Sequence, residues 1–306
     1  MKPAANHGNP VKISRPDKVE TNTKLSERTR GARPSRLREQ HIATLPAHLT
    51  ERDRRIALDC YEHHVLRTDQ LKRLHFTGLR TAAARLGLLY ELRVLDRLRP
   101  GAKRGEGTLP YHWILDEAGA LIVADHKGID PSQLHYTHAD ALRYATSRNL
   151  THHVEANEFF TRLAVEANQN HGALSEWYGV RTLAHLFAGT LLPDGYGVLT
   201  LPGRAPLHVL LELDRGTESS QILREKAKRY AEILPRSSLR NLDPFVILAV
   251  PSARRAQTAT AAIADTCAPL IVTVWSGTVT RSVLQIVIAA AAHTRIPFSP
   301  KRFSES

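Results

Sequence analysis

The chain has 306 residues, a formal net charge of +12, and a hydrophobic content of 42%, which is sufficient for packed cores. Its length suggests about two domains. Its two cysteines, Cys60 and Cys267, form no CxxC pair, which disfavours a disulfide scaffold and a cysteine metal site. The most apolar stretch, residues 283–292, is about half as long as a bilayer span. We therefore expect a soluble, cytoplasmic protein with no membrane association and a polyanionic partner.

Residues 1–45 are rich in Lys and Arg and contain almost no large apolar residues. Such a segment cannot bury enough surface to offset the entropy of ordering, so we expect a disordered basic arm. The arm is either a solvated tail without a partner or a non-specific phosphate-binding segment.

Residues 46–128 have the pattern of a small helical domain that ends in a β-hairpin. Thr50, which is followed by acidic residues, predicts a helix N-cap. The periodicity predicts a helix after Thr50, helices at 68–76 and 79–92, strands at 94–98 and 111–115, and a short helix from 116. This is the order of a winged helix-turn-helix, whose third helix enters the major groove of DNA and whose hairpin touches the backbone.

The residues suited to DNA contact fall on those two elements. The exposed side of the third helix would carry Arg80, Thr81 and Arg85, and the turn of the hairpin would carry Lys103 and Arg104. The alternative is a winged helix that binds a protein partner and has a solvated basic face.

Residues 129–150 are polar and His-rich and predict a linker, residues 151–295 predict a second domain, and residues 296–306 predict a tail. The periodicity of the second domain predicts a helix at 151–168, strands at 174–180, 196–201 and 207–214, a helix at 219–234, a strand at 245–250, a helix from 254 and a strand at 270–275. We therefore expect a mixed sheet flanked by helices, and an α/β fold class that is α+β over the whole chain.

Acidic residues interrupt the apolar strand at 207–214. Leu207, Val209, Leu211 and Leu213 share one face, whereas Glu212 and Asp214 point to the other face. A hairpin centred near residues 203–204 would place Asp194 opposite about residue 213, close enough to both acids to share an ion. On the next helix, Lys226 is the cation most directed toward the apolar stripe, so we expect it to meet one of these carboxylates.

The turn that follows the strand, Arg215-Gly216-Thr217, has two interpretations. In the structural one, Gly216 permits a tight turn and Thr217 caps the helix. In the functional one, Arg215 and Thr217 contact a phosphate beside the acids.

Several motifs together resemble the replication-relaxation family over about residues 48–255. They are the winged-helix segment, His153-x-x-x-Asn157, Trp177, Pro193-Asp194-Gly195, the stretch ELDRGTE at 212–218, and Lys226-x-x-x-Tyr230. The resemblance implies a DNA-binding protein of a plasmid or mobile element that acts in replication, relaxation or transfer. It also implies a relaxase or replication protein as a partner, and a homodimer is a further expectation.

The second domain also resembles the PD-(D/E)XK nuclease core. The resemblance implies that Asp194 and Glu212 hold Mg²⁺ and that a lysine positions or activates water. Asp214 stands where the pattern has that lysine, so Lys226 would replace it. Asp214 itself is either a third metal ligand or part of an ion pair with Arg215 or Lys226 in an inert fold. We expect His153, Asn157 and Glu158 to support the site.

Two functions therefore stay open from the sequence. One is a Mg²⁺-dependent DNA endonuclease, and the other is a non-enzymatic accessory factor or transcriptional regulator with a degenerate nuclease-like domain. A protein-interaction scaffold is a weaker third idea. No GxxxxGK loop is present, which disfavours ATP-driven chemistry.

Overall fold

The computed structural model describes residues 37–99, 109–277 and 281–293. The described residues divide into two compact units, 37–161 and 162–293, and each is treated by itself. Both contain helices packed on a β-sheet, so the predicted α/β class is confirmed. None of the helices in the described part of the chain has the length and apolar character that a membrane span requires.

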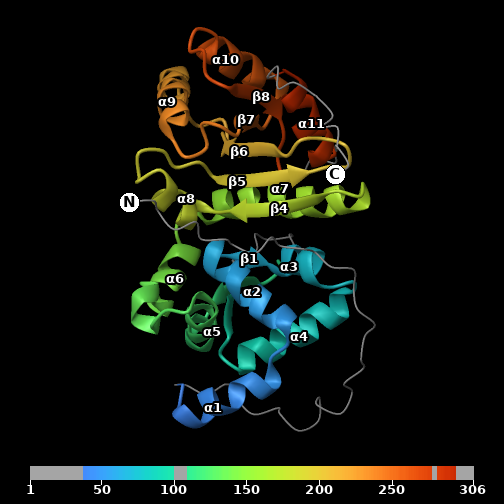
Figure 1. Cartoon of the computed structure of the whole chain (residues 1–306), viewed down its shortest axis with the longest axis vertical. Helices are drawn as coiled ribbons and strands as arrows, with labels where there is room; N and C mark the ends of the chain where they lie inside the picture. Colours follow the sequence, from blue (N-terminus) through green and yellow to red (C-terminus); the bar gives the residue numbers. More distant parts are fainter. Residues whose placement is uncertain (1–36, 100–108, 278–280, 294–306) are drawn as a thin grey trace, which may run out of the picture. The chain divides into compact units, whose positions relative to one another are not determined.

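The first unit is mainly helical and carries a small antiparallel sheet (Figure 1). Its elements are α1 (Glu39–His48), α2 (Glu51–Glu62), β1 (Leu66–Arg67), α3 (Thr68–His75), α4 (Leu79–Glu91), β2 (Leu95–Leu98), β3 (His112–Leu115), α5 (Glu117–Lys127), the 3₁₀ turn η1 (Pro131–Leu134) and α6 (His138–Ala145). The strand order is β1-β3-β2, and both pairs are antiparallel.

Local sequence signals explain the boundaries of α2, α3 and α4. Thr50 caps α2, because its hydroxyl accepts from the Asp53 N–H at 3.4 Å and its own N–H donates to the Asp53 carboxylate at 2.7 Å. Leu71, Leu86 and Leu89 are fully buried, as the helical spacing requires. The predicted cap, the three helices and the two hairpin strands are therefore confirmed, each within about two residues.

Two segments of this unit differ from the expectation. The basic arm predicted for residues 1–45 lies mostly outside the described residues, but its end, from Glu39, belongs to α1. The stretch predicted to be a linker contains η1 and α6, and Ala141 and Ala145 pack against Ile114 of β3. The buried side chains of α6 are small alanines spaced four residues apart. This apolar pattern is too weak to distinguish a helix from a polar linker in the sequence.

The second unit is a five-stranded mixed sheet with helices on its faces (Figure 1). Helix α7 (Leu150–Gln169) leads into it from the first unit. The following elements are β4 (Ala173–Tyr178), α8 (Val180–Leu186), β5 (Gly195–Thr200), β6 (Leu207–Leu213), α9 (Ser220–Ile233), η2 (Leu234–Arg236), β7 (Phe245–Val250), α10 (Ala253–Ile263), β8 (Leu270–Val274) and α11 (Val283–His293).

The strand order is β4-β5-β6-β7-β8. The β4–β5 and β5–β6 pairs are antiparallel, whereas β6–β7 and β7–β8 are parallel and are joined through α9 and α10. The predicted order of helices and strands is confirmed, with α8 and α11 as additions. Short apolar runs such as those of α8 and α11 do not separate helix from strand by periodicity alone.

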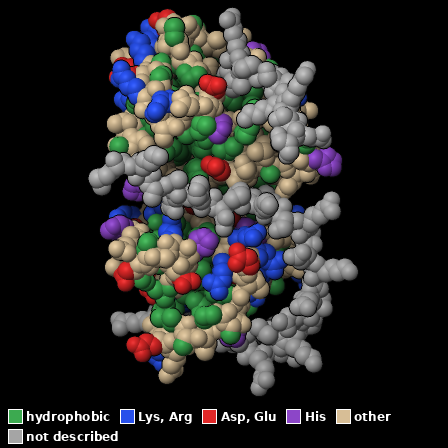
Figure 2. Space-filling model, viewed as in Figure 1, with side chains coloured by type: hydrophobic (Ala, Val, Ile, Leu, Met, Phe, Trp, Pro, Cys, Tyr) green, Lys and Arg blue, Asp and Glu red, His purple; other side chains and the backbone are tan. Residues whose placement is uncertain are grey.

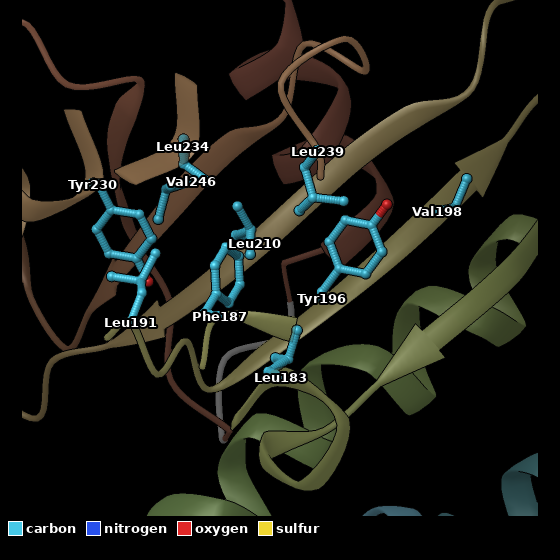
Figure 3. Packing of buried hydrophobic residues seen from close by; sticks show 10 residues of the cluster. All are labelled: Leu183, Phe187, Leu191, Tyr196, Val198, Leu210, Tyr230, Leu234, Leu239 and Val246. Carbon is cyan, nitrogen blue, oxygen red and sulfur yellow. The ribbon is translucent and has the colours of Figure 1, made fainter. Parts of the chain in front are cut away.

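One face of this sheet is closed by α8, α9 and the segment after α9 (Figure 3). Tyr196 and Leu210, which pair across β5 and β6, meet Leu183 and Phe187 from α8 and its end. Tyr230 and Leu234 complete the cluster from α9 and η2. Side chains of one strand that are two residues apart share a face, so this cluster also fixes where Glu212 points.

Candidate functional site

Asp194 and Glu212 face each other at one end of the β5–β6 hairpin. The register pairs Gly195 with Leu211, so one step further places Asp194 beside Glu212 and not beside residue 213 as predicted. The backbone fixes Asp194 twice: its N–H donates to the Leu211 carbonyl at 2.9 Å, and its carboxylate Oδ2 accepts from the Leu213 N–H at 2.8 Å. The predicted proximity of the two acids is therefore confirmed, although the register is one residue different.

Glu212 is buried, with 7% of its side chain exposed, and α9 supplies a partner for each of its oxygens. The Tyr230 hydroxyl donates to Oε1 at 2.5 Å, and the Lys226 ammonium donates to Oε2 at 3.3 Å. Lys226 and Tyr230 are four residues apart, so they lie one turn apart on one face of α9. The inward direction predicted for Lys226 is confirmed.

Lys226 also donates to Glu218 Oε1 at 2.7 Å, a partner that the sequence did not predict. The other oxygen of that carboxylate, Oε2, is buried without a hydrogen-bond partner among the described residues. Glu218 lies in the turn before α9, where pattern reasoning treats an acid as a solvated residue at a helix start. Asp194, Glu212, Glu218 and Lys226 therefore form an acid–lysine cluster, in which three carboxylates lie near one ammonium.

The electrostatics of this cluster follow from burial and from charge proximity. Burial, and then the nearby Asp194 carboxylate, raise the pKa of Glu212 to about 7, although Lys226 and Tyr230 oppose the shift. Burial lowers the pKa of Lys226, but Glu212, Glu218 and Asp194 outweigh it and raise that pKa above its ordinary value. Burial and the neighbouring Glu212 raise the pKa of the Tyr230 phenol well above its ordinary value.

Asp214 has a different environment from the two facing acids. It is buried just past the end of β6, and its Oδ1 accepts from the Gly216 N–H at 2.8 Å. Its Oδ2 accepts from Arg255 Nε of α10. Neither predicted partner, Arg215 nor Lys226, forms this ion pair; instead the distant Arg255 does.

The turn between β6 and α9 supports the structural interpretation of Gly216. Its φ of +82° is in the left-handed region that favours glycine. The predicted cap Thr217 is wrong, because the N-cap is Ser219, whose hydroxyl accepts from the Ile222 N–H at 3.3 Å. Arg215 is exposed in this turn, and phosphate contact by it stays a prediction.

The arrangement of these carboxylates limits how they could hold a divalent cation. Across the described residues, no three Asp, Glu, His or Cys side chains form a group that could hold a metal ion. Asp214 does not fit as a ligand, because Arg255 and the Gly216 N–H occupy both of its oxygens. Both oxygens of Glu212 are likewise hydrogen-bonded, to Tyr230 and Lys226, so an ion held by Asp194 and Glu212 would have to displace the Lys226 ammonium.

The helix that carries Lys226 has a basic outer surface. Figure 2 shows Lys and Arg side chains gathered over α9. Its exposed cations are Arg224, Lys228 and Arg229, while Lys226 is turned inward. A polyanion that approaches this helix therefore meets positive charge.

The predicted DNA-binding residues of the first unit fall into three groups. Arg80 and Thr81 are exposed in the first turn of α4. Arg85 is committed to the fold, because it binds the fully buried carboxylate of Asp53 and donates to the His48 carbonyl at 2.8 Å. Lys103 and Arg104 lie outside the described residues.

The predicted supporting residues on α7 make their described contacts within the first unit. The Asn157 amide donates to the carbonyls of His63 and Val65 at 3.3 and 2.9 Å. The buried Glu158 accepts from Arg67 and Arg73, each at 3.1 Å. His153 packs its ring 4.6 Å from that of Tyr144. We assign all three a part in holding α7 to the first unit.

A model of the replication-relaxation family matches residues 59–241, which is more than half of the chain. The chain belongs to the replication-relaxation family. No curated protein and no solved structure matches it. Membership of this family suggests a role in the replication or relaxation of plasmid or mobile-element DNA.

The replication-relaxation match spans α3, α4, the β2–β3 hairpin and every member of the acid–lysine cluster. Arg255, the partner of Asp214, lies beyond it. Sequence reasoning missed Arg255 because α10 starts about forty residues after Asp214, and only the parallel β6–β7 pairing brings them together. It also missed Arg97 of β2 and Arg99, which directly follows β2; both lie over aromatic rings, and their spacing of two residues could have indicated a shared face.

Proposed function

We propose that this replication-relaxation protein binds duplex DNA through the exposed face of α4. The observation that carries the proposal is the composition of that helix. From Leu79 to Tyr90 it contains no acidic residue, its one acid is the last residue, Glu91, and its first turn exposes Arg80 and Thr81. A helix that docks in the major groove lies between phosphates, so an exposed face with cations and hydroxyls and few carboxylates favours that docking.

The surrounding elements support the same proposal. Helices α2, α3 and α4, followed by the β2–β3 hairpin and joined by β1 at the sheet, have the order of a winged helix-turn-helix. Ala83 and Ala84 are also exposed, so the face after Arg80 is smooth and allows close approach of a duplex. In this proposal Lys103 and Arg104 extend the contact from the hairpin turn.

Arg80→Ala tests this proposal against a matched loss of charge elsewhere. Arg148 is exposed on the α6–α7 connection, so Arg148→Ala removes one positive charge from the same unit. We expect Arg80→Ala to weaken binding of a labelled duplex, measured by fluorescence anisotropy, by about tenfold or more, and Arg148→Ala to leave it near the wild-type value. Absence of duplex binding by the intact protein, or equal losses in both variants, would overturn the proposal.

A second candidate function, Mg²⁺-dependent hydrolysis of a phosphodiester, is favoured by the acid–lysine cluster. Asp194 and Glu212 would hold the ion, which when bound would polarise a phosphate and an attacking water. Lys226 stays charged at neutral pH beside both acids, so its ammonium can orient the phosphate or the water once it leaves Glu212. The exposed cations of α9 would attract the DNA strand that is to be cut.

Plasmid nicking in Mg²⁺ or Mn²⁺ tests the second candidate. Asp194→Asn and Lys226→Met should abolish nicking, whereas Glu225→Gln, exposed on the same helix, should not. Neither nicking nor a metal-dependent rise in melting temperature would leave the alternative of a non-enzymatic accessory factor or regulator, in which the cluster is a buried ion network. A relaxase or replication protein as a partner, and a homodimer, stay predictions.

A further inference from the structure

Two arginines and two tyrosines form an alternating column beside α4. The Arg97 guanidinium carbon lies 4.4 Å from the ring centroids of both Tyr90, at the end of α4, and Tyr111, just before β3. The Arg99 guanidinium carbon lies 3.9 Å from the centroid of Tyr111. The contacts therefore run from Tyr90 through Arg97 and Tyr111 to Arg99, and the Trp113 centroid also lies 5.8 Å from the Arg97 guanidinium carbon. Each contact is within the range of a cation–π interaction.

These two arginines differ from the inward-facing arginines of the same unit. In the part of the chain that the structure describes, neither the Arg97 guanidinium nor that of Arg99 is paired with a carboxylate. Each of the following is instead paired with an acid: Arg67, Arg73, Arg85 and Arg93. The column therefore carries two positive charges that the described residues do not neutralise.

A guanidinium that lies over an aromatic ring can still offer N–H groups that point away from the ring. The edge N–H groups of arginine match two oxygens of a phosphate, while its faces suit aromatic rings. A side chain that is already held in place loses less conformational entropy when it binds a ligand. The column is therefore preorganised for a phosphate or another oxyanion.

The column continues the exposed face of α4. Arg80 and Tyr90 are ten residues apart, about 15 Å along the helix axis. The residues between them on that face are small: Ala83 and Ala84 are exposed, and a Cβ added to Gly87 would meet nothing within 4 Å. This face thus has Arg80 at its start and Glu91 at its end, and Arg97 lies over the ring of the neighbouring Tyr90.

We propose that the column Tyr90–Arg97–Tyr111–Arg99 binds backbone phosphates of the duplex on which α4 docks. This inference rests on the proposed DNA binding and assigns it a second contact, separate from Arg80. Arg97 and Arg99 supply the charge, and Tyr90 and Tyr111 fix where that charge lies. The contact reads no bases, because phosphates carry no sequence information.

The dependence of duplex affinity on salt tests this assignment in the full chain. Removing one arginine that binds a phosphate should lower the slope of log affinity against log salt concentration by about 0.9. We expect that decrease for Arg97→Ala and for Arg99→Ala, and about twice that decrease for the double variant. The control Arg148→Ala should keep the wild-type slope. Circular dichroism melting of every variant shows that it folds.

Substitutions of Tyr111 test whether its ring positions Arg97 and Arg99 for the phosphate or whether the two charges act without it. Tyr111→Phe keeps the ring and should keep wild-type affinity, whereas Tyr111→Leu removes it and should weaken binding several-fold with Arg97 and Arg99 intact. Wild-type slopes in the folded Arg97 and Arg99 variants would overturn the column while leaving DNA binding by α4 in place. A slope lowered equally by Arg148→Ala would overturn it too. Failure of the intact protein to bind any duplex would overturn the proposed function itself, and the column with it.

Discussion

Arg255 of α10 binds the carboxylate of Asp214, which stands two residues after Glu212. The same guanidinium donates to the Glu218 carbonyl at 2.6 Å through Nη2. One arginine therefore ties both ends of the turn that leads from β6 into α9. Because Glu218 and Lys226 bind each other after this turn, Arg255 acts on the acid–lysine cluster through the backbone. Asp214 thus anchors the turn, and each of its oxygens accepts a hydrogen bond in doing so.

Removal of either partner of this pair should destabilise the second unit strongly. Asp214 and Arg255 expose only 1% and 14% of their side chains, so a lone survivor would be a buried charge without compensation. We expect Asp214→Asn and Arg255→Met each to cost about 3–5 kcal/mol of unfolding free energy, and the double variant to cost less than the sum. Urea titration measures all three. Arg254→Ala, exposed beside it, should change stability by less than about 0.5 kcal/mol, and strict additivity would contradict the pairing.

The stability of the protein should carry a pH dependence that belongs to Glu212. The pKa of this carboxyl rises from 4.5 to about 7 on folding, so between these values the folded state binds more protons than the unfolded state. The stability that proton binding by Glu212 contributes to the folded state is fully present below about pH 4.5 and is lost as the pH rises through about 7. The melting temperature of the wild type relative to Glu212→Gln, measured in EDTA, should therefore fall across this window.

Glu225→Gln provides the control for that experiment, because Glu225 is exposed on the same helix. Its melting temperature relative to the wild type should stay constant across the window. A constant or rising difference for Glu212→Gln would show that Glu212 is ionised throughout.

Tyr230→Phe should move the window for Glu212 to higher pH. The Tyr230 hydroxyl donates to Glu212 Oε1 and lowers the pKa of that carboxyl by favouring its ionised form. Without the hydroxyl the pKa should rise further, and the ionised carboxylate would lose a buried hydrogen bond at a cost of about 1–3 kcal/mol. The melting curve against pH measures both effects. An unchanged window would mean that the hydroxyl does not stabilise the carboxylate.

Local sequence patterns predicted most of the secondary structure and the core of the candidate site. Alternation of apolar residues in β6 and the spacing of Lys226 on α9 were enough to bring Lys226 to Glu212. The hairpin pattern predicted that Asp194 approaches Glu212, but the predicted strand register was one residue off. The loop between β5 and β6 is longer than a two-residue turn, so the sequence does not fix the register.

The remaining partners could not be predicted because they depend on tertiary pairing. Arg255 reaches Asp214 through the parallel pairing of β6 and β7, and parallel pairs have no local turn signal. Arg85 was assigned to DNA from its place on an exposed-looking helix face, but a buried acid from α2 faces it. Sequence alone predicts that an arginine on a helix faces solvent, because it does not show where a carboxylate partner from another element lies.

Arg85 and Arg80, on the same helix, should therefore respond differently to alanine substitution. Arg85→Ala would leave Asp53, which is fully buried, without its cation, and should cost about 3 kcal/mol or more of unfolding free energy. Arg80→Ala should leave stability within about 0.5 kcal/mol and weaken duplex binding. Thermal melting and anisotropy on the two variants measure the two effects separately. A stable Arg85→Ala that fails only in DNA binding would restore its predicted role.

Two glycines of the first unit test how tightly the packing limits side chains. A Cβ on Gly119 in α5 would lie 2.2 Å from the Val94 carbonyl oxygen and 2.5 Å from Leu115 Cδ1, so the backbones would have to separate. Gly119→Ala should therefore lower the unfolding free energy by about 2 kcal/mol or more, through overpacking.

A Cβ on Gly87 in α4 would meet nothing within 4 Å, and Gly87→Ala should stabilise the helix by up to about 1 kcal/mol. Because Gly87 also lies on the face proposed to enter the groove, anisotropy on this more stable variant tells how close the duplex comes. Unchanged affinity would mean that DNA does not approach the middle of α4, whereas a loss despite greater stability would place the duplex against it.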